Sequence, residues 1–102
     1  MIRHIVLANL RGDLSPAEKE SLFAALAGMK EHIPGIVAVT VGANNSPEGL
    51  DRGHSHGFTV DFVDAAARDA YLPHPHHVKV GTQLVGATEG GVGGLLVLDY
   101  EV

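Results

Sequence analysis

The sequence predicts an α+β fold of the ferredoxin-like type, with the order βαββαβ and the helices on one face of an antiparallel sheet. Three short segments rich in Val, Ile and Leu and a fourth with alternating apolar residues are typical of strands, and two intervening segments have helical spacing or composition. Their order forms two βαβ-like halves. A length of 102 residues is enough for one domain, residues 1–102, with a single hydrophobic core.

The first half of the chain is predicted to form a strand, a long helix and a second strand. Residues 2–10 are rich in Ile, Val and Leu, as strands are. Ser15 and Glu18 then match a capping box, with proline at the first helical position. Apolar residues at helical spacing follow until residues 34–35, Pro-Gly, end the helix. The second strand is expected over residues 36–41.

The second half is predicted to repeat this order with a broken helical region. Residues 56–62 alternate apolar and polar side chains, which indicates a strand with one buried face. Asp64 has the position of a helix N-cap, and Pro73 should end that helix near Tyr71. A second helical segment can begin at Pro75 and run towards residue 85, because proline is tolerated at a first helical position.

Two connecting segments and a last strand complete the prediction. Residues 43–53 contain Asn, Pro and Gly and are expected to form the longest loop. The glycine-rich residues 90–94 are expected to be a flexible connector, since no Lys-Ser/Thr pair follows as it does in a phosphate-binding loop. Residues 95–100 form the closing strand.

Both faces of the predicted sheet are apolar, and this predicts a homodimer. If the first and third strands are central, Ile5 and Leu7 lie on the opposite face from Val6 and Ala8. Helices on one side leave the second face bare, and soluble monomers rarely expose a patch of that size. We therefore expect two copies to pack together through the sheet face.

Composition excludes several classes of function. Seven Lys and Arg against twelve Asp and Glu give a net charge of −5, which disfavours nucleic-acid binding. The absence of cysteine excludes disulfides, thiolate catalysis and cysteine-ligated metals. No apolar run has the length of a membrane span or resembles a signal peptide, so we expect no membrane partner and a cytoplasmic location. No cofactor is predicted.

The candidate site lies in residues 54–81, which hold five of the seven histidines. Tyr71, His74 and His77 flank the predicted helix break, where side chains can converge. His4 and His56 could join them as neighbours if the first and third strands pair. Imidazole titrates near neutral pH, so a partly buried histidine beside a tyrosine hydroxyl can act as an acid/base pair. Alternatively, these histidines are hydrogen-bonded core residues or solvated corner residues.

A metal site is the second candidate chemistry. His74, His76 and His77, with His4 or His56, offer nitrogen ligands suited to zinc, nickel or copper. A structural zinc site needs four well-spaced ligands, however, and the proline between these histidines restricts how they can converge. The prediction is therefore that no metal is bound.

Three stretches, GFTVDF, AARDAYLPHPHHV and LLVLDY, resemble the stress-responsive A/B barrel (Dabb) family, and the similarity covers nearly the whole chain. The resemblance implies a dimeric α+β barrel. Its most specific part is the run containing Tyr71, His74 and His77. Plant polyketide cyclases of this family use the matching tyrosine and last histidine in an aldol-type ring closure, which implies that Tyr71 and His77 are catalytic.

The resemblance also implies a set of pocket residues. Histidines on the first and third strands line the cyclase pocket, and they correspond to His4 and His56. On the first helix this chain has Leu26 where the cyclase has a pocket tyrosine. The predicted substrate-binding residues are therefore His4, His56, His74 and Leu26.

Three functions remain open from the sequence. The first is a homodimeric, stress-associated protein that binds a small molecule. The second is a lyase or cyclase that performs acid/base chemistry on a polyketide-like carbonyl substrate. The third is a monooxygenase of dimeric α+β barrel architecture, although architecture alone does not determine function.

Overall fold

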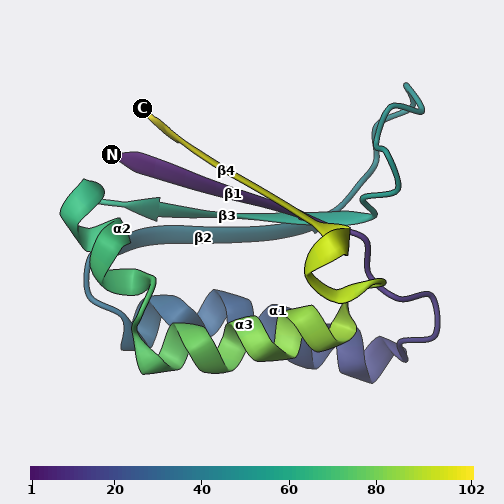
Figure 1. Ribbon diagram of the computed structural model, residues 1–102, viewed down its shortest axis with the longest axis horizontal. Helices are drawn as coiled ribbons and strands as arrows, with labels where there is room; N and C mark the ends of the chain where they lie inside the picture. The colour runs from purple at the N-terminus through teal and green to yellow at the C-terminus, as the bar shows by residue number, and fades with distance from the viewer.

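A four-stranded antiparallel sheet covered on one face by helices forms the protein, as Figure 1 shows for the computed structural model, which describes residues 1–102. The elements are β1 (Ile2–Ala8), α1 (Pro16–His32), β2 (Ile36–Ala43), β3 (His56–Phe62), α2 (Ala65–Tyr71), α3 (Pro75–Ala87), a 3₁₀ turn η1 (Gly91–Gly94) and β4 (Leu95–Glu101). The strand order is β2-β3-β1-β4, so β1 and β3 are central. The predicted ferredoxin-like fold is confirmed.

Each helix begins at a side chain that caps it. Ser15 Oγ accepts a hydrogen bond from the Glu18 amide at 3.1 Å, and the Glu18 carboxylate accepts one from the Ser15 amide at 3.1 Å. Asp64 Oδ1 accepts from the amide of Ala67 at 2.8 Å. His74 Nδ1 accepts from the amide of His76 at 3.1 Å. The first two caps were predicted from the sequence, whereas the third was not, because histidine is an uncommon capping residue.

The strand and helix ends differ from the predictions where the chain meets η1. β1 ends at Ala8 instead of residue 10, because the next residue, Asn9, bonds to the end of α3 and to η1: its amide donates to Gly94 O at 2.9 Å and its carbonyl accepts from Glu89 N at 2.8 Å. Within the predicted connector, residues 91–94 form a 3₁₀ turn, which was not anticipated from the sequence. A Cβ on Gly94 would collide with the Glu89 carbonyl, which explains the glycine there.

The hydrophobic core lies between the sheet and the helices. Alternate residues of β1 and β3 face it, and Val60 and Phe62 are fully buried there. Leu22 and Met29 of α1 pack onto them. At the other end of α1, Gly35 adopts φ +89° in the turn to β2, and a side chain there would meet Ala67 of α2 at 2.6 Å. The turn and α2 therefore approach closely only because residue 35 is glycine.

The opposite sheet face carries no helix, as the ribbon in Figure 1 shows. β4, at the edge, exposes apolar side chains on this face: Leu96 is 41% exposed, Leu98 46% and Tyr100 47%. None of the helices combines the length and the apolar composition that crossing a bilayer requires. The bare face is an apolar surface that the fold leaves without a partner within the chain.

We expect Ser15→Ala to lower the free energy of unfolding by about 1 kcal/mol, because the capping box would lose its hydroxyl acceptor. Urea unfolding at fixed protein concentration measures this. Ser21→Ala is the matched control, since Ser21 is exposed in the same helix. The control should change stability by less than about 0.5 kcal/mol. Equal effects of the two substitutions would contradict the capping argument.

Candidate functional site

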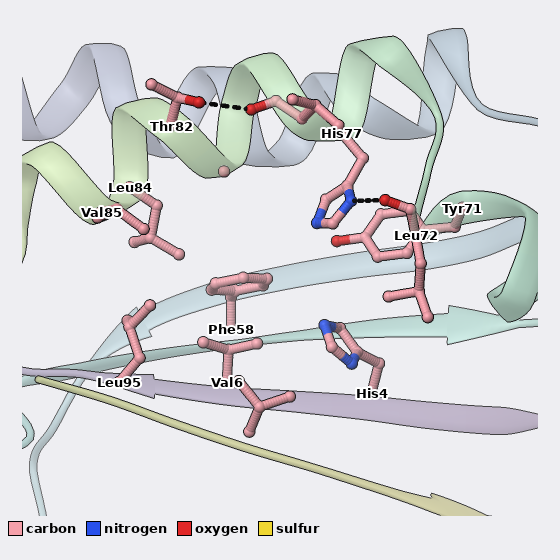
Figure 2. Close-up of a pocket in the computed structure, with 13 residues that line it drawn as sticks. His4, Val6, Phe58, Tyr71, Leu72, His77, Thr82, Leu84, Val85 and Leu95 are labelled. Atoms are coloured by element: carbon pink, nitrogen blue, oxygen red, sulfur yellow. Dashed lines mark hydrogen bonds between the residues drawn. The ribbon is translucent and has the colours of Figure 1, made fainter. Parts of the chain in front are cut away.

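A cavity of about 500 Å³ lies between α3 and the β1–β4 half of the sheet, and Figure 2 shows its walls. Its lining is mostly apolar, with polar side chains gathered at one end. The lining residues are His4, Val6, Phe58, Tyr71, Leu72, His77, Val78, Gly81, Thr82, Leu84, Val85, Leu95 and Val97. Such a cavity has the size and lining typical of small-molecule sites.

Tyr71, the last residue of α2, forms the floor of the polar end. Its side chain is 1% exposed and packs against Phe62, with ring centroids 4.9 Å apart. Every fully buried side-chain polar atom of the protein has a hydrogen-bond partner. The Tyr71 hydroxyl has none, so it reaches the cavity, as Figure 2 shows. Burial and the nearby charge of Asp99 raise the pKa of Tyr71, which keeps the hydroxyl protonated and able to donate.

His77, in the first turn of α3, lies against Tyr71, with ring centroids 3.9 Å apart. Its Nδ1 is 3.0 Å from the carbonyl oxygen of Leu72. Because a carbonyl can only accept, Nδ1 carries the proton and Nε2 in the neutral ring has a free lone pair. Burial lowers the pKa of His77, although the Leu72 hydrogen bond opposes this shift. His77 thus presents an unprotonated nitrogen to the cavity (Figure 2).

His4 enters the cavity from β1 and is held from behind by a carboxylate. Its Nδ1 is 2.7 Å from Asp99 Oδ1 on β4, and Arg68 of α2 donates to Asp99 Oδ2 at 3.0 Å. The other ring nitrogen of His4 points towards the cavity (Figure 2). Burial raises the pKa of Asp99, but the hydrogen bonds from His4 and Arg68 outweigh it and hold that pKa below its usual range. Asp99 is therefore ionised and fixes the orientation of the His4 ring.

Sequence reasoning missed Asp99 and Arg68. The available signal was the single acidic residue within the apolar run LLVLDY of β4. Asp99 is paired with His4 in the β1–β4 register, so the two side chains share the face that the helices cover. That pairing could not be read from either strand alone.

His56 lies far from this group, so the expectation that His4 and His56 are neighbours was wrong. In the β1–β3 register His56 pairs with Ala8, whereas His4 pairs with Val60 four residues away. His56 packs on Phe23 with ring centroids 5.5 Å apart, and its Nδ1 is 2.8 Å from Ser55 Oγ. It does not line the main cavity.

Leu26 and His74 also lie outside the main cavity. Leu26 is 2% exposed and lines, together with His56, a separate hollow of only about 10 Å³. His74 uses its Nδ1 to cap α3. The prediction that Leu26, His56 and His74 contact a ligand stays a prediction. The places of these three residues outside the main cavity do not support it.

The remaining histidines do not assemble with acidic residues. His76 stacks on His32 of α1, with ring centroids 4.2 Å apart, on the outside of the helices. No group of three or more His, Cys, Asp or Glu side chains in the protein is arranged to hold a metal ion. The chemistry of the cavity is thus a hydroxyl donor, Tyr71, and a nitrogen acceptor, His77, beside a histidine–carboxylate pair.

Comparisons with known proteins agree with the fold. The model of the "Stress responsive A/B Barrel Domain" family matches residues 2–102. The stress-response A/B barrel domain-containing protein HS1 of Arabidopsis thaliana is 30% identical, over 98% of this chain and 88% of its own. Olivetolic acid cyclase of Cannabis sativa is 24% identical, over 97% of this chain and 94% of its own.

A solved structure from Jannaschia sp. CCS1 is 33% identical and superposes with a TM-score of 0.88, covering 99% of this chain and 98% of its own. It is described as a dimeric ferredoxin-like protein of unknown function. The similarity extends over both chains almost completely, so it concerns the whole fold and not a shared fragment.

We expect the His77→Asn variant to lose less stability than the wild type when the pH is lowered. Because the pKa of His77 is lowered in the folded state, the unfolded chain takes up a proton at this residue first, below about pH 6.5. The stabilisation is complete above that pH and is lost as pH falls towards the folded pKa. Asn retains a donor to the Leu72 carbonyl but cannot be protonated.

Urea unfolding between about pH 8 and about pH 5 checks this prediction. The wild type should lose more free energy of unfolding over this range than the variant. A slope remains in the variant, because the pKa values of His56 and His76 are lowered as well. Identical slopes would show that His77 is not buried in its neutral form.

Proposed function

The chain belongs to the stress-responsive A/B barrel (Dabb) domain family, and from that premise we propose that it is a homodimer that binds a small organic molecule between α3 and the sheet. One observation carries the proposal. The Tyr71 hydroxyl and the His77 Nε2 have no partner within the protein and face the same cavity of about 500 Å³. A role in stress responses is inferred from the family's description alone.

The polar end of the cavity defines what the ligand must provide. Tyr71 offers a donor and needs an acceptor, and the neutral His77 offers an acceptor and needs a donor or an acidic hydrogen. A carbonyl compound with an adjacent C–H or hydroxyl group meets both needs within one small molecule. The apolar walls, among them Phe58, Leu84 and Val85, favour an apolar body on that ligand.

The bare sheet face supports the homodimer. Its outward positions on β1 and β4 are mostly apolar and include Ile5, Leu7 and Leu98. The polar positions lie towards β3, which presents Thr59 and also Asp61, the ion-pair partner of Arg3 on β1. A second copy of this chain would bury the apolar half and leave the polar half at the rim. The Jannaschia relative, which is described as dimeric, supports the same assembly.

A second candidate function, a lyase or cyclase, is favoured by the protonation states of the site. His77 Nε2 would remove a proton from the carbon next to a carbonyl, while Tyr71 donates a hydrogen bond to the oxygen that becomes an enolate. The enolate carbon then forms a bond to a second carbonyl carbon, and the histidinium returns its proton to the new alkoxide. His4, oriented by Asp99, places a further ring nitrogen beside this pair. The relative named olivetolic acid cyclase supports this chemistry.

The monooxygenase hypothesis rests on shared architecture, and no contact in the cavity favours it over acid/base chemistry. The cytoplasmic location and the single-domain boundaries likewise stay predictions. The site residues we propose are therefore Tyr71 and His77 in direct contact with the ligand, with His4 beside them.

We expect Tyr71→Phe to lower any proton abstraction by about 100-fold, because the enolate oxygen would lose its donor. Acetophenone, a ketone with an apolar ring, is a suitable probe. Deuterium exchange of its methyl protons in D₂O, followed by proton NMR, reports abstraction directly. Because the hydroxyl has no partner in the protein, stability should be nearly unchanged.

Tyr100→Phe is the matched control, since Tyr100 lies on the other face of the sheet and phenylalanine keeps the apolar ring that the proposed dimer interface would bury. It should leave the exchange rate at the wild-type value. Wild-type exchange no faster than in buffer would remove the catalytic candidate and leave the binding proposal. Equal rates in wild type and Tyr71→Phe would remove the assigned role of Tyr71.

We expect Leu98→Asp to convert the dimer to monomers, because a charge would be buried in the sheet-to-sheet interface. Native mass spectrometry and analytical ultracentrifugation measure the subunit count. Val92→Asp is the control, since Val92 is 71% exposed on η1, away from the bare sheet face. A monomeric wild type, or a dimeric Leu98→Asp variant, would contradict the proposed interface.

A further inference from the structure

The stripe of α3 that faces the cavity contains a glycine beside the proposed base. Gly81 follows His77 by four residues, so the two positions lie one above the other on the same helix face. The stripe consists of His77, Val78, Gly81, Thr82, Leu84 and Val85. Gly81 is thus the only cavity-lining position of α3 without a side chain, and it adjoins the polar group.

Neither the backbone nor the packing requires a glycine at this position. Gly81 is not among the residues with positive φ, so an L-residue could adopt its conformation. A Cβ added there would approach one side-chain atom, His77 Nε2, at 3.9 Å, which is ordinary van der Waals contact. Glycine in a helix interior nevertheless destabilises the helix relative to alanine. The sequence therefore keeps a destabilising residue where alanine would fit.

We propose that Gly81 keeps open the approach to His77 Nε2 and so determines which ligands reach it. This inference rests on the proposed function, because it assumes that the ligand occupies this cavity. A ligand atom hydrogen-bonded to Nε2 lies about 3 Å from it. The methyl group of an alanine at position 81 would lie only 3.9 Å from Nε2. It would occupy the space that the groups attached to this ligand atom need. Gly81 selects for ligands with a ring or branch next to the polar group.

The neighbouring residues fix the direction of the ligand. The Thr82 hydroxyl already donates to the Val78 carbonyl at 2.9 Å, so it offers no free donor. His77 is then the one polar partner that α3 provides, at the N-terminal end of the stripe. Beyond Gly81 the wall is formed by Leu84, Val85 and Leu95. The ligand's polar group therefore lies at His77 and its apolar body extends along α3.

Gly81→Ala tests the inference, because it should raise the stability of the protein while it reduces access to His77 Nε2. Removing the helix-interior glycine should raise the melting temperature by about 4 °C. Access to His77 Nε2 is measured with diethyl pyrocarbonate, which acylates unprotonated imidazole nitrogen, at a pH where His77 is neutral. Mass spectrometry of the digested protein gives the rate for each histidine. The rate at His77 should fall by about tenfold.

Two controls accompany the variant. Gly28→Ala changes a glycine inside α1 that also has open space around it, so it should raise stability similarly without slowing His77. His54 is an internal reference in every sample, since its Nδ1 contacts the Asp51 carbonyl at 2.8 Å and its Nε2 is free like that of His77. Its rate should be the same in all three proteins.

An unchanged rate at His77 in Gly81→Ala would overturn the inference, as would a loss of stability, which would show that packing requires the glycine. The result is independent of the acetophenone experiment. If ketone exchange is absent but Gly81→Ala still slows acylation, the proposed chemistry fails while the role of Gly81 in access stands. If exchange occurs and acylation is not slowed, the chemistry stands and the role of Gly81 fails.

Discussion

The break between α2 and α3 is the constraint on which the site depends. Pro73 and Pro75 prevent one continuous helix, so the carbonyl of Leu72 is not used by a helical amide four residues later. The amide of His76 bonds instead to the side chain of His74. The free Leu72 carbonyl then accepts from His77 Nδ1, which determines the tautomer of the ring. A structural interruption of the helix thus creates the unprotonated nitrogen that faces the cavity.

The carboxylate that orients the site, Asp99, lies outside the cavity. Asp99 lies on the edge strand β4, where it is partly exposed, and it bonds both His4 and Arg68. These contacts link β1, β4 and α2 around one carboxylate. Because Asp99 remains ionised, it orients His4. Burial raises the pKa of Tyr71, and the charge of Asp99 adds to that effect.

Strand β4 contributes to both surfaces that we consider functional. Leu95 and Val97 face the cavity, whereas Leu96 and Leu98 face the bare side of the sheet. This follows from the alternation of side chains along a strand. A partner subunit on the bare face would hold β4 in position, and the position of β4 sets one wall of the cavity. Dimerisation and ligand binding consequently depend on the same strand.

Local features were sufficient to predict much of this protein. The capping box at Ser15, the cap at Asp64 and the stop near Tyr71 depend on residues within one helical turn, so the sequence determines them directly. The closeness of Tyr71 and His77 follows equally, because only five residues, two of them prolines, separate them. Apolar alternation in β1 and β4 indicated the two-sided sheet, and with it the expectation of a second copy.

Tertiary structure alone decided which distant residues meet. Strand alternation placed His4 and His56 on the helix-covered face, but the register of β1 against β3 put them at different ends of it. Asp99 was brought to His4 by the register of β4, and Arg68 by the docking of α2. Register is set by the packing of the whole core, and a shift of one residue would turn every side chain to the other face. No segment of the chain carries that information by itself.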